Sequence, residues 1–474
     1  MNFLLFDPVT LFNSLPSTSN PLSAMVFIFL KGGWIFVLAV IFWGLWEAYK
    51  EYIRNRYDSS LKFVLLAIDI PKNNEQSPKA VEHIFSHLYG IKKSGNLKDK
   101  YIKGYTQPSF SLEIVSIEGY IQFLIRTPVK FRDLVEAAVY AQYPDAEITE
   151  VEDYVDMIPK PLEFYHPKYD IWGTEFKLQN TDLYPIRTYP LFEHSLSQKL
   201  MDPMASILEI MSRMGPGESL WIQIIIAPVG EEWRKKGLAL INKLIGKKSD
   251  KKGVDLMYFP REIGRGLSES FTATFVPTTE MGEQKQKKER EWPSMMQHLS
   301  PQEKEVVEAV GMKIGKLGFK TKIRYIYSAP KDRFNKSKGT YAINGAFAQF
   351  TSQNLNGFVV NKKTRTKIDY YFIKTRLLGR IRRILWGYRY RSMKRGRPGF
   401  VLNIEELATL WHFPQIDIKV PSVQTVDARK STPPMGLPME EESVFSKQPS
   451  KPASGKPTST AEPKGTPPVN LPFA

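Results

Sequence analysis

The 474-residue chain contains no cysteine. Disulfide bonds, iron–sulfur clusters, thiolate zinc sites and a cysteine nucleophile are therefore excluded. Because disulfides are typical of oxidising compartments, the absence of cysteine favours a folded part that faces a reducing compartment.

The chain also lacks the glycine patterns that bind nucleotides. The segment nearest to a P-loop, residues 311–317, fails in its glycine spacing and in its final hydroxyl residue. Gly264 and Gly266 lack the third glycine and the preceding strand of a dinucleotide site. His83 and His87 have no third ligand nearby in the sequence, so we interpret them as exposed histidines. We expect no enzymatic activity, no cofactor and no bound metal.

Charge is nearly absent from the segment that follows residues 1–21. Between residues 22 and 46 the only charged residue is Lys31, and this length matches the ~20 residues that cross a bilayer. We predict a single transmembrane helix over residues 22–48. Because basic residues follow this segment and none precedes Lys31, the positive-inside rule places residues 1–21 outside the inner membrane and the bulk of the chain in the cytoplasm.

The clearest periodicity lies in residues 111–155. Apolar residues alternate on both sides of residues 118–119 (Glu-Gly), which predicts a tight hairpin, because glycine tolerates positive φ. Residues 127–128 (Thr-Pro) have the pattern of a helix start, and a further strand follows the helix. A strand over residues 61–70 is predicted upstream, and a helix that starts at residues 77–78 and ends near residue 90 follows it, before the hairpin. Residues 60–157 therefore have the β-α-β-β-α-β order of a ferredoxin-like domain.

The first strand of this domain, residues 61–70, is nearly continuously apolar. A strand of this kind is covered on both faces of its sheet. In the ferredoxin-like order it lies inside the sheet. We therefore predict that the face away from the domain's helices is covered too, by the second domain or by another chain.

A second, larger α+β domain of related type is predicted over residues 165–420. The predicted elements are helices over 204–211, 231–245 and 341–350, a helix that starts at a capping box at 300–303, and strands over 219–227 and 320–328. Residues 246–297 are interpreted as a charged insertion, and residues 421–474, rich in Pro, Ser and Lys, as a disordered tail. The predicted fold class is thus α+β, with a transmembrane helix, a ferredoxin-like domain, a second α+β domain and a disordered Pro-rich tail.

The net charge of +17 indicates an anionic partner, which can be nucleic acid, an acidic membrane surface or an acidic protein. The strongest functional signal is residues 374–397, which contain ten basic residues and no acid. Apolar residues of its first part share one face, which predicts a basic amphipathic helix. The candidate contact residues are Arg376, Arg380, Arg382, Arg383, Arg389, Arg391, Lys394, Arg395, Trp386 and Tyr388.

Three interpretations of this helix stay open. Its apolar face can pack on the domain while the arginines are merely solvated. It can instead bind an anionic inner-leaflet surface. Finally, it can bind a nucleic-acid backbone, with Trp386, Tyr388 and Tyr390 stacking on bases.

Three segments, residues 111–155, 221–228 and 400–414, resemble the N-terminal, non-ATPase half of membrane-anchored HerA/TraG-like conjugation or type IV secretion ATPases of small-genome bacteria. The most specific pieces are residues 140–145 (YAQYPD) and 403–409 (NIEELAT). In such proteins a proline-rich linker and a P-loop motor domain follow. The resemblance implies that the motor is missing here, so no nucleotide-binding residue carries over.

From these features we expect a membrane-anchored accessory or scaffold subunit of a conjugation-like translocation machine for DNA or protein. Its expected partners are a P-loop, HerA/TraG-like ATPase on another chain, the lipid bilayer, DNA, and further copies of itself in a homo-oligomer. Two alternatives are a membrane-tethered nucleic-acid-binding protein and a purely structural membrane scaffold.

Overall fold

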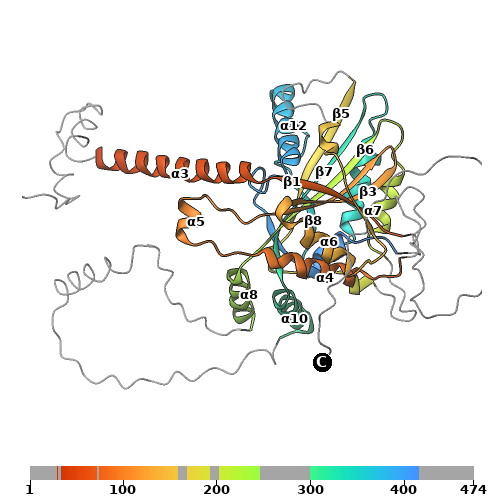
Figure 1. Ribbon diagram of the computed structural model, residues 1–474, viewed down its shortest axis with the longest axis horizontal. Coiled ribbons are helices and arrows are strands. Elements are labelled where there is room, and N and C mark those ends of the chain that lie inside the picture. The colour runs from red at the N-terminus through yellow and green to blue at the C-terminus, as the bar shows by residue number, and fades with distance from the viewer. Residues whose placement is uncertain are drawn as a thin grey trace, which may run out of the picture. The chain divides into compact units, whose positions relative to one another are not determined.

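The computed structural model describes residues 34–71, 74–157, 168–192, 202–245 and 299–415, together with Phe29. Within these residues the strands form one nine-stranded sheet in the order β4-β1-β3-β2-β6-β7-β5-β8, and β9 pairs with β7 (Figure 1). The strand pairs are all antiparallel. The predicted extracytoplasmic N-terminus (1–21), charged insertion (246–297) and disordered tail (421–474) lie outside the described residues.

The first repeat of the fold runs from β1 to β4. Its elements are β1 (Phe63–Asp69), α4 (Pro78–Leu88), α5 (Leu97–Tyr101), β2 (Phe110–Ile117), β3 (Tyr120–Pro128), α6 (Arg132–Tyr140) and β4 (Glu147–Glu150). Its strand order β4-β1-β3-β2 places β1 inside the sheet, as the ferredoxin-like element order requires.

The hairpin between β2 and β3 forms at the predicted Glu-Gly pair. Glu118 and Gly119 have φ of 55° and 88°, and two consecutive positive values match a turn of the type that favours glycine. A Cβ at position 119 would lie 2.7 Å from the Ser212 carbonyl oxygen, so the close approach of the neighbouring segment also requires glycine there.

The helix that was predicted to start at Thr127 starts later. β3 stays paired with β1 through Pro128, and the Val129 amide donates to the Lys62 carbonyl. The backbone at Thr127 and Pro128 is therefore part of the sheet and cannot start a helix. A 3-10 turn (Val129–Phe131) follows, and α6 begins at Arg132. Sheet pairing thus overrides the local Thr-Pro signal.

A second repeat follows the same plan. Its elements are β5 (Tyr169–Leu178), α7 (Ala205–Ser212), β6 (Ser219–Pro228), α8 (Glu231–Leu244), α10 (Pro301–Gly315), β7 (Gly318–Pro330), α11 (Ala342–Ala348) and β8 (Phe358–Val360). The strand order β6-β7-β5-β8 is the first repeat's order read from the other end. α12 (Ile373–Arg389), β9 (Phe400–Asn403) and α13 (Ile404–Leu410) complete the described chain.

The two repeats are joined edge to edge through β2 and β6. Eight residue pairs, from Phe110 with Ile226 to Ile117 with Ser219, connect these strands. The regions that were predicted as two domains therefore share one sheet, and they belong to one compact unit, Met1–Ala428.

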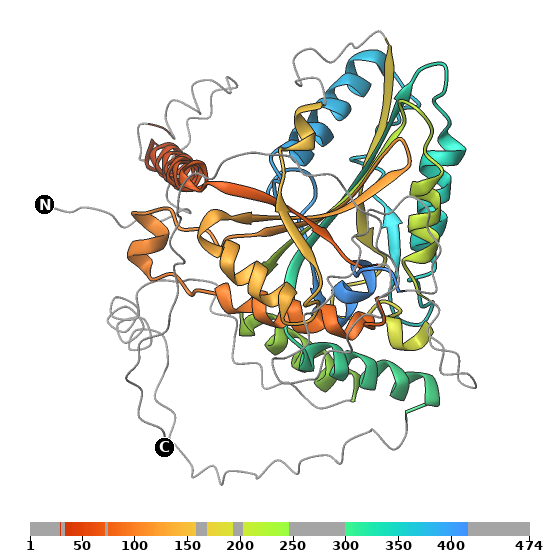
Figure 2. The same ribbon diagram turned by 45° about the vertical axis from the view of Figure 1, so that its right-hand side comes forward.

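The sheet is covered on both faces, and Figure 2 shows α12 on one side of it and α4, α6 and α7 on the other. The main core lies under that second set of helices and includes Leu66 and Ile68 of β1. On the opposite face Leu65 and Ala67 of β1 pack in a second cluster that contains residues of α12. The second layer over the doubly apolar first strand is thus formed largely by the basic helix.

The predicted transmembrane helix is wrong. Residues 34–48 belong to α3 (Trp34–Ser60), in which charged residues recur from Glu47 onward. Among the helices of the described residues, none is long and apolar enough to cross a membrane. Apart from Phe29, residues 22–33 of the predicted span lie outside the described residues. Within α3 the uncharged apolar stretch covers residues 34–46, which is shorter than the ~20 residues that cross a bilayer.

If the two repeats fold as one unit, a cavity in either of them destabilises both. Ile224 of β6 is buried and faces the main core opposite Leu112 of β2. We expect Ile224→Ala to lower the free energy of unfolding by about 2–5 kcal/mol. Urea denaturation followed by circular dichroism should keep a single transition, and hydrogen exchange should accelerate in β1 as much as in β6.

The exposed Lys235→Ala on α8 serves as the control and should change the stability by no more than about 0.5 kcal/mol. Two separated transitions in the Ile224→Ala protein would show that the repeats unfold independently.

Candidate anion-binding site

α12 lies across the sheet face opposite the main helix layer. Ile381, Ile384 and Leu385 of its apolar side are buried and pack in one cluster with Trp221 of β6 and Ile326 of β7. The predicted amphipathic helix is therefore present, and its apolar face packs on the protein's own sheet.

A rung of buried polar side chains crosses the sheet beneath the end of α12. In the strand register, Glu113 of β2 pairs with Gln223 of β6, and Gln223 pairs with Arg324 of β7. Arg324 pairs in turn with Glu175 of β5. Gln223 Nε2 donates to Glu113 Oε1 at 3.1 Å, and Arg324 Nε donates to Glu175 Oε1 at 2.9 Å. Since buried charges persist only when they are paired, the rung ties β2, β6, β7 and β5 together.

Arg391, just beyond α12, completes this rung at Glu113. Its Nε and Nη2 donate to the two Glu113 oxygens at 2.9 and 3.1 Å, and Nη1 donates to Asp153 at 2.5 Å. Burial opposes the ionisation of Glu113, but Arg391, together with the hydroxyls of Ser111 and Tyr154, holds the pKa of Glu113 below its usual value. The same carboxylates raise the pKa of Arg391 in spite of its burial.

Two tyrosines extend this network toward α12. The Tyr154 hydroxyl donates to Glu113 Oε2 at 2.7 Å and lies 2.7 Å from the Tyr388 hydroxyl. Burial raises the pKa of both tyrosines well above the usual value. The ring of Tyr388 is fully buried against Trp221, so it cannot stack on a ligand.

Arg324 also holds the segment that follows α12. Its guanidinium donates to the carbonyl oxygens of Gly387, Ser392 and Arg395, at 3.0, 2.6 and 2.8 Å. Lys322 Nζ donates to the same Arg395 carbonyl at 2.6 Å. Burial, with repulsion from Arg324, lowers the pKa of Lys322 to about 7.

Glu175 fixes the next turn of this segment. Its Oε2 accepts a hydrogen bond from the Arg397 amide at 2.8 Å. Gly396, with φ of 90°, lies so close that a Cβ there would be 2.1 Å from a Glu175 carboxylate oxygen. The buried rung thereby sets the backbone from which Arg395 and Arg397 project.

Several of the predicted contact residues are engaged within the protein. Arg380 Nη1 donates to the carbonyls of Arg365 and Lys367. Arg389 forms an ion pair with Asp156, and Lys394 with Asp58 of α3 at 3.2 Å. Two further candidates lie against aromatic rings: Arg376 lies over Tyr370, and Arg395 lies over Trp386, with 3.5 Å to the ring centroid. Arg382 is exposed.

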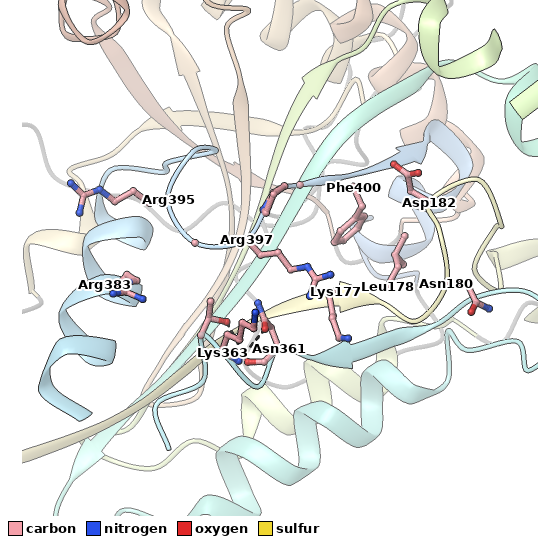
Figure 3. A pocket seen from close by; sticks show the side chains of 14 residues that line it. Lys177, Leu178, Asn180, Asp182, Asn361, Lys363, Arg383, Arg395, Arg397 and Phe400 are labelled. Atoms are coloured by element: carbon pink, nitrogen blue, oxygen red, sulfur yellow. Dashed lines mark hydrogen bonds between the residues drawn. The ribbon is translucent and has the colours of Figure 1, made fainter. Parts of the chain in front are cut away.

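Arg383 of α12 lines a depression with a volume of about 870 Å³, and Figure 3 shows it together with Arg397, Lys363 and Lys177 around this space. Lys363 lies in the segment after β8, and Lys177 lies near the end of β5. The side chain of Arg395 points away from the middle of the depression in Figure 3. We call this space the basic depression.

Charge in the basic depression is unbalanced. In the described part of the chain, none of the ion pairs involves Lys177, Lys363, Arg383 or Arg397. Among the described residues that line it, Asp182 is the only acid, and its carboxylate accepts a hydrogen bond from the Val401 amide at 3.0 Å. Four unpaired cations on a fixed backbone are suited to bind a phosphate group or another oxyanion.

Sequence reasoning missed the rung, and it missed Lys177 and Lys363. Glu113 and Gln223 stand alone among apolar residues in the middle of buried strands, which is a signal that could have indicated them. No comparable signal marks Lys177 and Lys363, because they reach the depression from separate parts of the chain.

Other histidine sites have structural roles or are exposed. His412 Nε2 lies 2.9 Å from Asp202 Oδ1, and its Nδ1 lies 2.7 Å from the Ala408 carbonyl oxygen. His83 and His87 are exposed on α4. Within the described residues no group of three side chains could hold a metal ion.

The comparison with known families matches residues 47–426 to a domain of unknown function, DUF8128. This match covers most of the chain, and the chain belongs to that family. It includes both repeats, the rung and the basic depression. No curated protein matches the chain.

The Glu113–Arg391 pair should be essential for stability in a pH-dependent way. Glu113→Gln leaves the Arg391 charge buried with only Asp153 as an acidic partner, and we expect a loss of about 3–5 kcal/mol at pH 7. Because the pKa of Glu113 is lowered by folding, its ionised form stabilises the protein above the ordinary glutamate pKa of ~4.3. This contribution is lost as the pH falls through the lower folded pKa.

The difference between wild type and Glu113→Gln, measured by urea denaturation, should therefore be largest near neutral pH and should shrink below pH ~4. Glu209→Gln, which breaks an exposed pair with Arg213 on α7, is the matched control and should cost at most about 1 kcal/mol. A pH-independent difference would rule out the ionised pair as the cause.

Proposed function

We propose that this DUF8128 protein binds nucleic-acid phosphates at the basic depression, as an accessory subunit of a nucleic-acid translocation machine. The observation that carries the proposal is the set of unpaired cations, Lys177, Lys363, Arg383 and Arg397, around one depression. Nucleic-acid binding by phosphate contacts requires such a set of basic groups facing one ligand.

The charge of the whole chain supports the same ligand class. A net charge of +17 creates a potential that attracts polyanions over a distance and accelerates their encounter. The basic depression then offers short-range contacts. Its backbone is held from within by Glu175 and Arg324, so little ordering is needed when an anion binds.

The translocation context rests on the resemblance of residues 111–155, 221–228 and 400–414 to the non-ATPase half of HerA/TraG-like ATPases. The 474 residues contain no P-loop pattern. In this proposal, ATP hydrolysis is supplied by a P-loop ATPase on another chain, and the protein contributes a surface along which the nucleic acid is held.

The proposal predicts salt-dependent binding of oligonucleotides that depends on the basic depression. Lys363, Arg383 and Arg397 are all exposed, so the triple substitution to Gln should fold. Fluorescence anisotropy with a labelled oligonucleotide should show at least a tenfold weaker affinity at low salt. Each lost phosphate contact should lower the slope of log K against log salt by about 0.7–0.9.

The control replaces three exposed lysines of the first repeat, Lys79, Lys98 and Lys100, by Gln and causes the same change in net charge. It should keep the salt slope of the wild type. Equal losses in both triple variants would show that binding reflects net charge only, and the proposed site would be rejected.

A further inference from the structure

Four consecutive apolar residues are exposed immediately before and at the start of α12. Tyr370, Tyr371, Phe372 and Ile373 have 55%, 84%, 81% and 52% of their surface exposed. Isolated exposed apolar residues are ordinary, but a contiguous group with two almost fully exposed rings indicates a contact surface. We call residues 370–373 the aromatic tip.

The backbone of the aromatic tip contains a bulky residue in the left-handed conformation. Phe372 has φ of 58° and ψ of 42°, the left-handed region, which bulky residues rarely adopt. The first turn of α12 continues directly from it, because the Arg376 amide donates to the Phe372 carbonyl at 3.1 Å. The exposed rings thus stand at a defined corner of the chain.

The aromatic tip and the basic depression are connected by one face of α12. Arg376, Arg380 and Arg383 are spaced i, i+4 and i+7, so they lie on the same side of the helix. Arg376 lies 4.8 Å from the ring centroid of Tyr370 in the tip, and Arg383 lines the depression.

Arg380, between them, fixes the segment that runs alongside. It donates to the carbonyls of Arg365 and Lys367, and this segment connects Lys363 in the depression to Tyr370 in the tip. From Arg376 to Arg383 the helix rises by about 10 Å, which is the length of about three nucleotides at the ~3.4 Å spacing of a stacked strand.

We propose that the aromatic tip stacks on unpaired bases and that the ligand of this surface is single-stranded nucleic acid. This inference rests on the proposed phosphate binding at the basic depression. Aromatic rings bind any base through its face, whereas in a duplex the base faces are covered by their neighbours. A strand whose phosphates enter the depression can place its next bases against Tyr371 and Phe372.

An anionic membrane is the other surface that aromatic and basic residues contact, but the shape of the site favours a strand. Lys363 and Arg397 line a depression, and a single strand can enter a depression that a broad bilayer surface would pass over. On a single strand the aromatic tip would stack on bases, whereas on a membrane it would contact the bilayer surface. Removing its rings therefore distinguishes the two ligands.

The test uses the full chain with Tyr371 and Phe372 both replaced by Ala. The probes are a fluorescein-labelled 15-nucleotide oligothymidylate, the matched 15-base-pair duplex, and vesicles of phosphatidylcholine with phosphatidylserine. We expect the affinity for the single strand to fall by about tenfold or more with an unchanged salt slope, while duplex and vesicle binding change by less than twofold. Replacing both residues by Trp should restore single-strand binding.

Tyr140→Ala with Tyr341→Ala removes two exposed rings elsewhere and is the matched control. If the tip variant binds the single strand like the wild type, the stacking inference is overturned. Phosphate binding still stands in that case, provided that the Lys363, Arg383 and Arg397 triple variant loses affinity. If neither variant loses affinity, both proposals fail. A loss of vesicle binding alone would assign the tip to a membrane and also overturn the inference.

Discussion

The pairing of buried charges beneath α12 is the constraint on which the rest of the structure depends. Glu113 and Glu175 are buried on two strands of the sheet, and each requires a cation at hydrogen-bond distance. Arg391 and Arg324 supply these cations. Because the four residues come from both repeats and from the segment after α12, the sheet, the helix and this segment must assemble together for any of the charges to be satisfied.

The same pairing separates structural arginines from those free to bind a ligand. The guanidinium groups of Arg324 and Arg391 donate hydrogen bonds to carboxylates and backbone carbonyls within the protein. In doing so they fix the backbone around Gly396, and Arg383 and Arg397 reach solvent beside it. A rigid interior network thus supports an exterior site whose cations are unpaired, which is the arrangement that binds an anion with little loss of side-chain and backbone entropy.

The tandem repeat explains why a basic helix could be placed on this sheet. Joining β2 to β6 makes a broad sheet, whose main helix layer covers one face. The other face remains apolar, as the first strand shows, and needs a cover. α12 provides it with Ile381, Ile384 and Leu385, so its basic side is left facing outward. On that side the aromatic tip lies at the start of the helix, and Arg383 lines the basic depression.

Local sequence by itself determined much of the backbone. Alternation and the Glu-Gly pair predicted the β2–β3 hairpin, and the capping box at Ser300 and Glu303 marks the start of α10, because these features depend on neighbouring residues alone. The amphipathic pattern of residues 374–397 likewise predicted the helix α12. The transmembrane helix was wrong, and the start of α6 was displaced by strand pairing with a distant segment.

Only the tertiary structure decided which charged residues are buried, paired or free. Arg383 and Arg391 belong to one basic run and look alike in the sequence, yet the first lines the basic depression and the second is buried against Glu113, 278 positions away. The partners of an ionised side chain are set by strand register and helix docking, which join segments far apart in the chain. The sequence therefore determined that α12 is basic and amphipathic, and the fold determined where its charge is available.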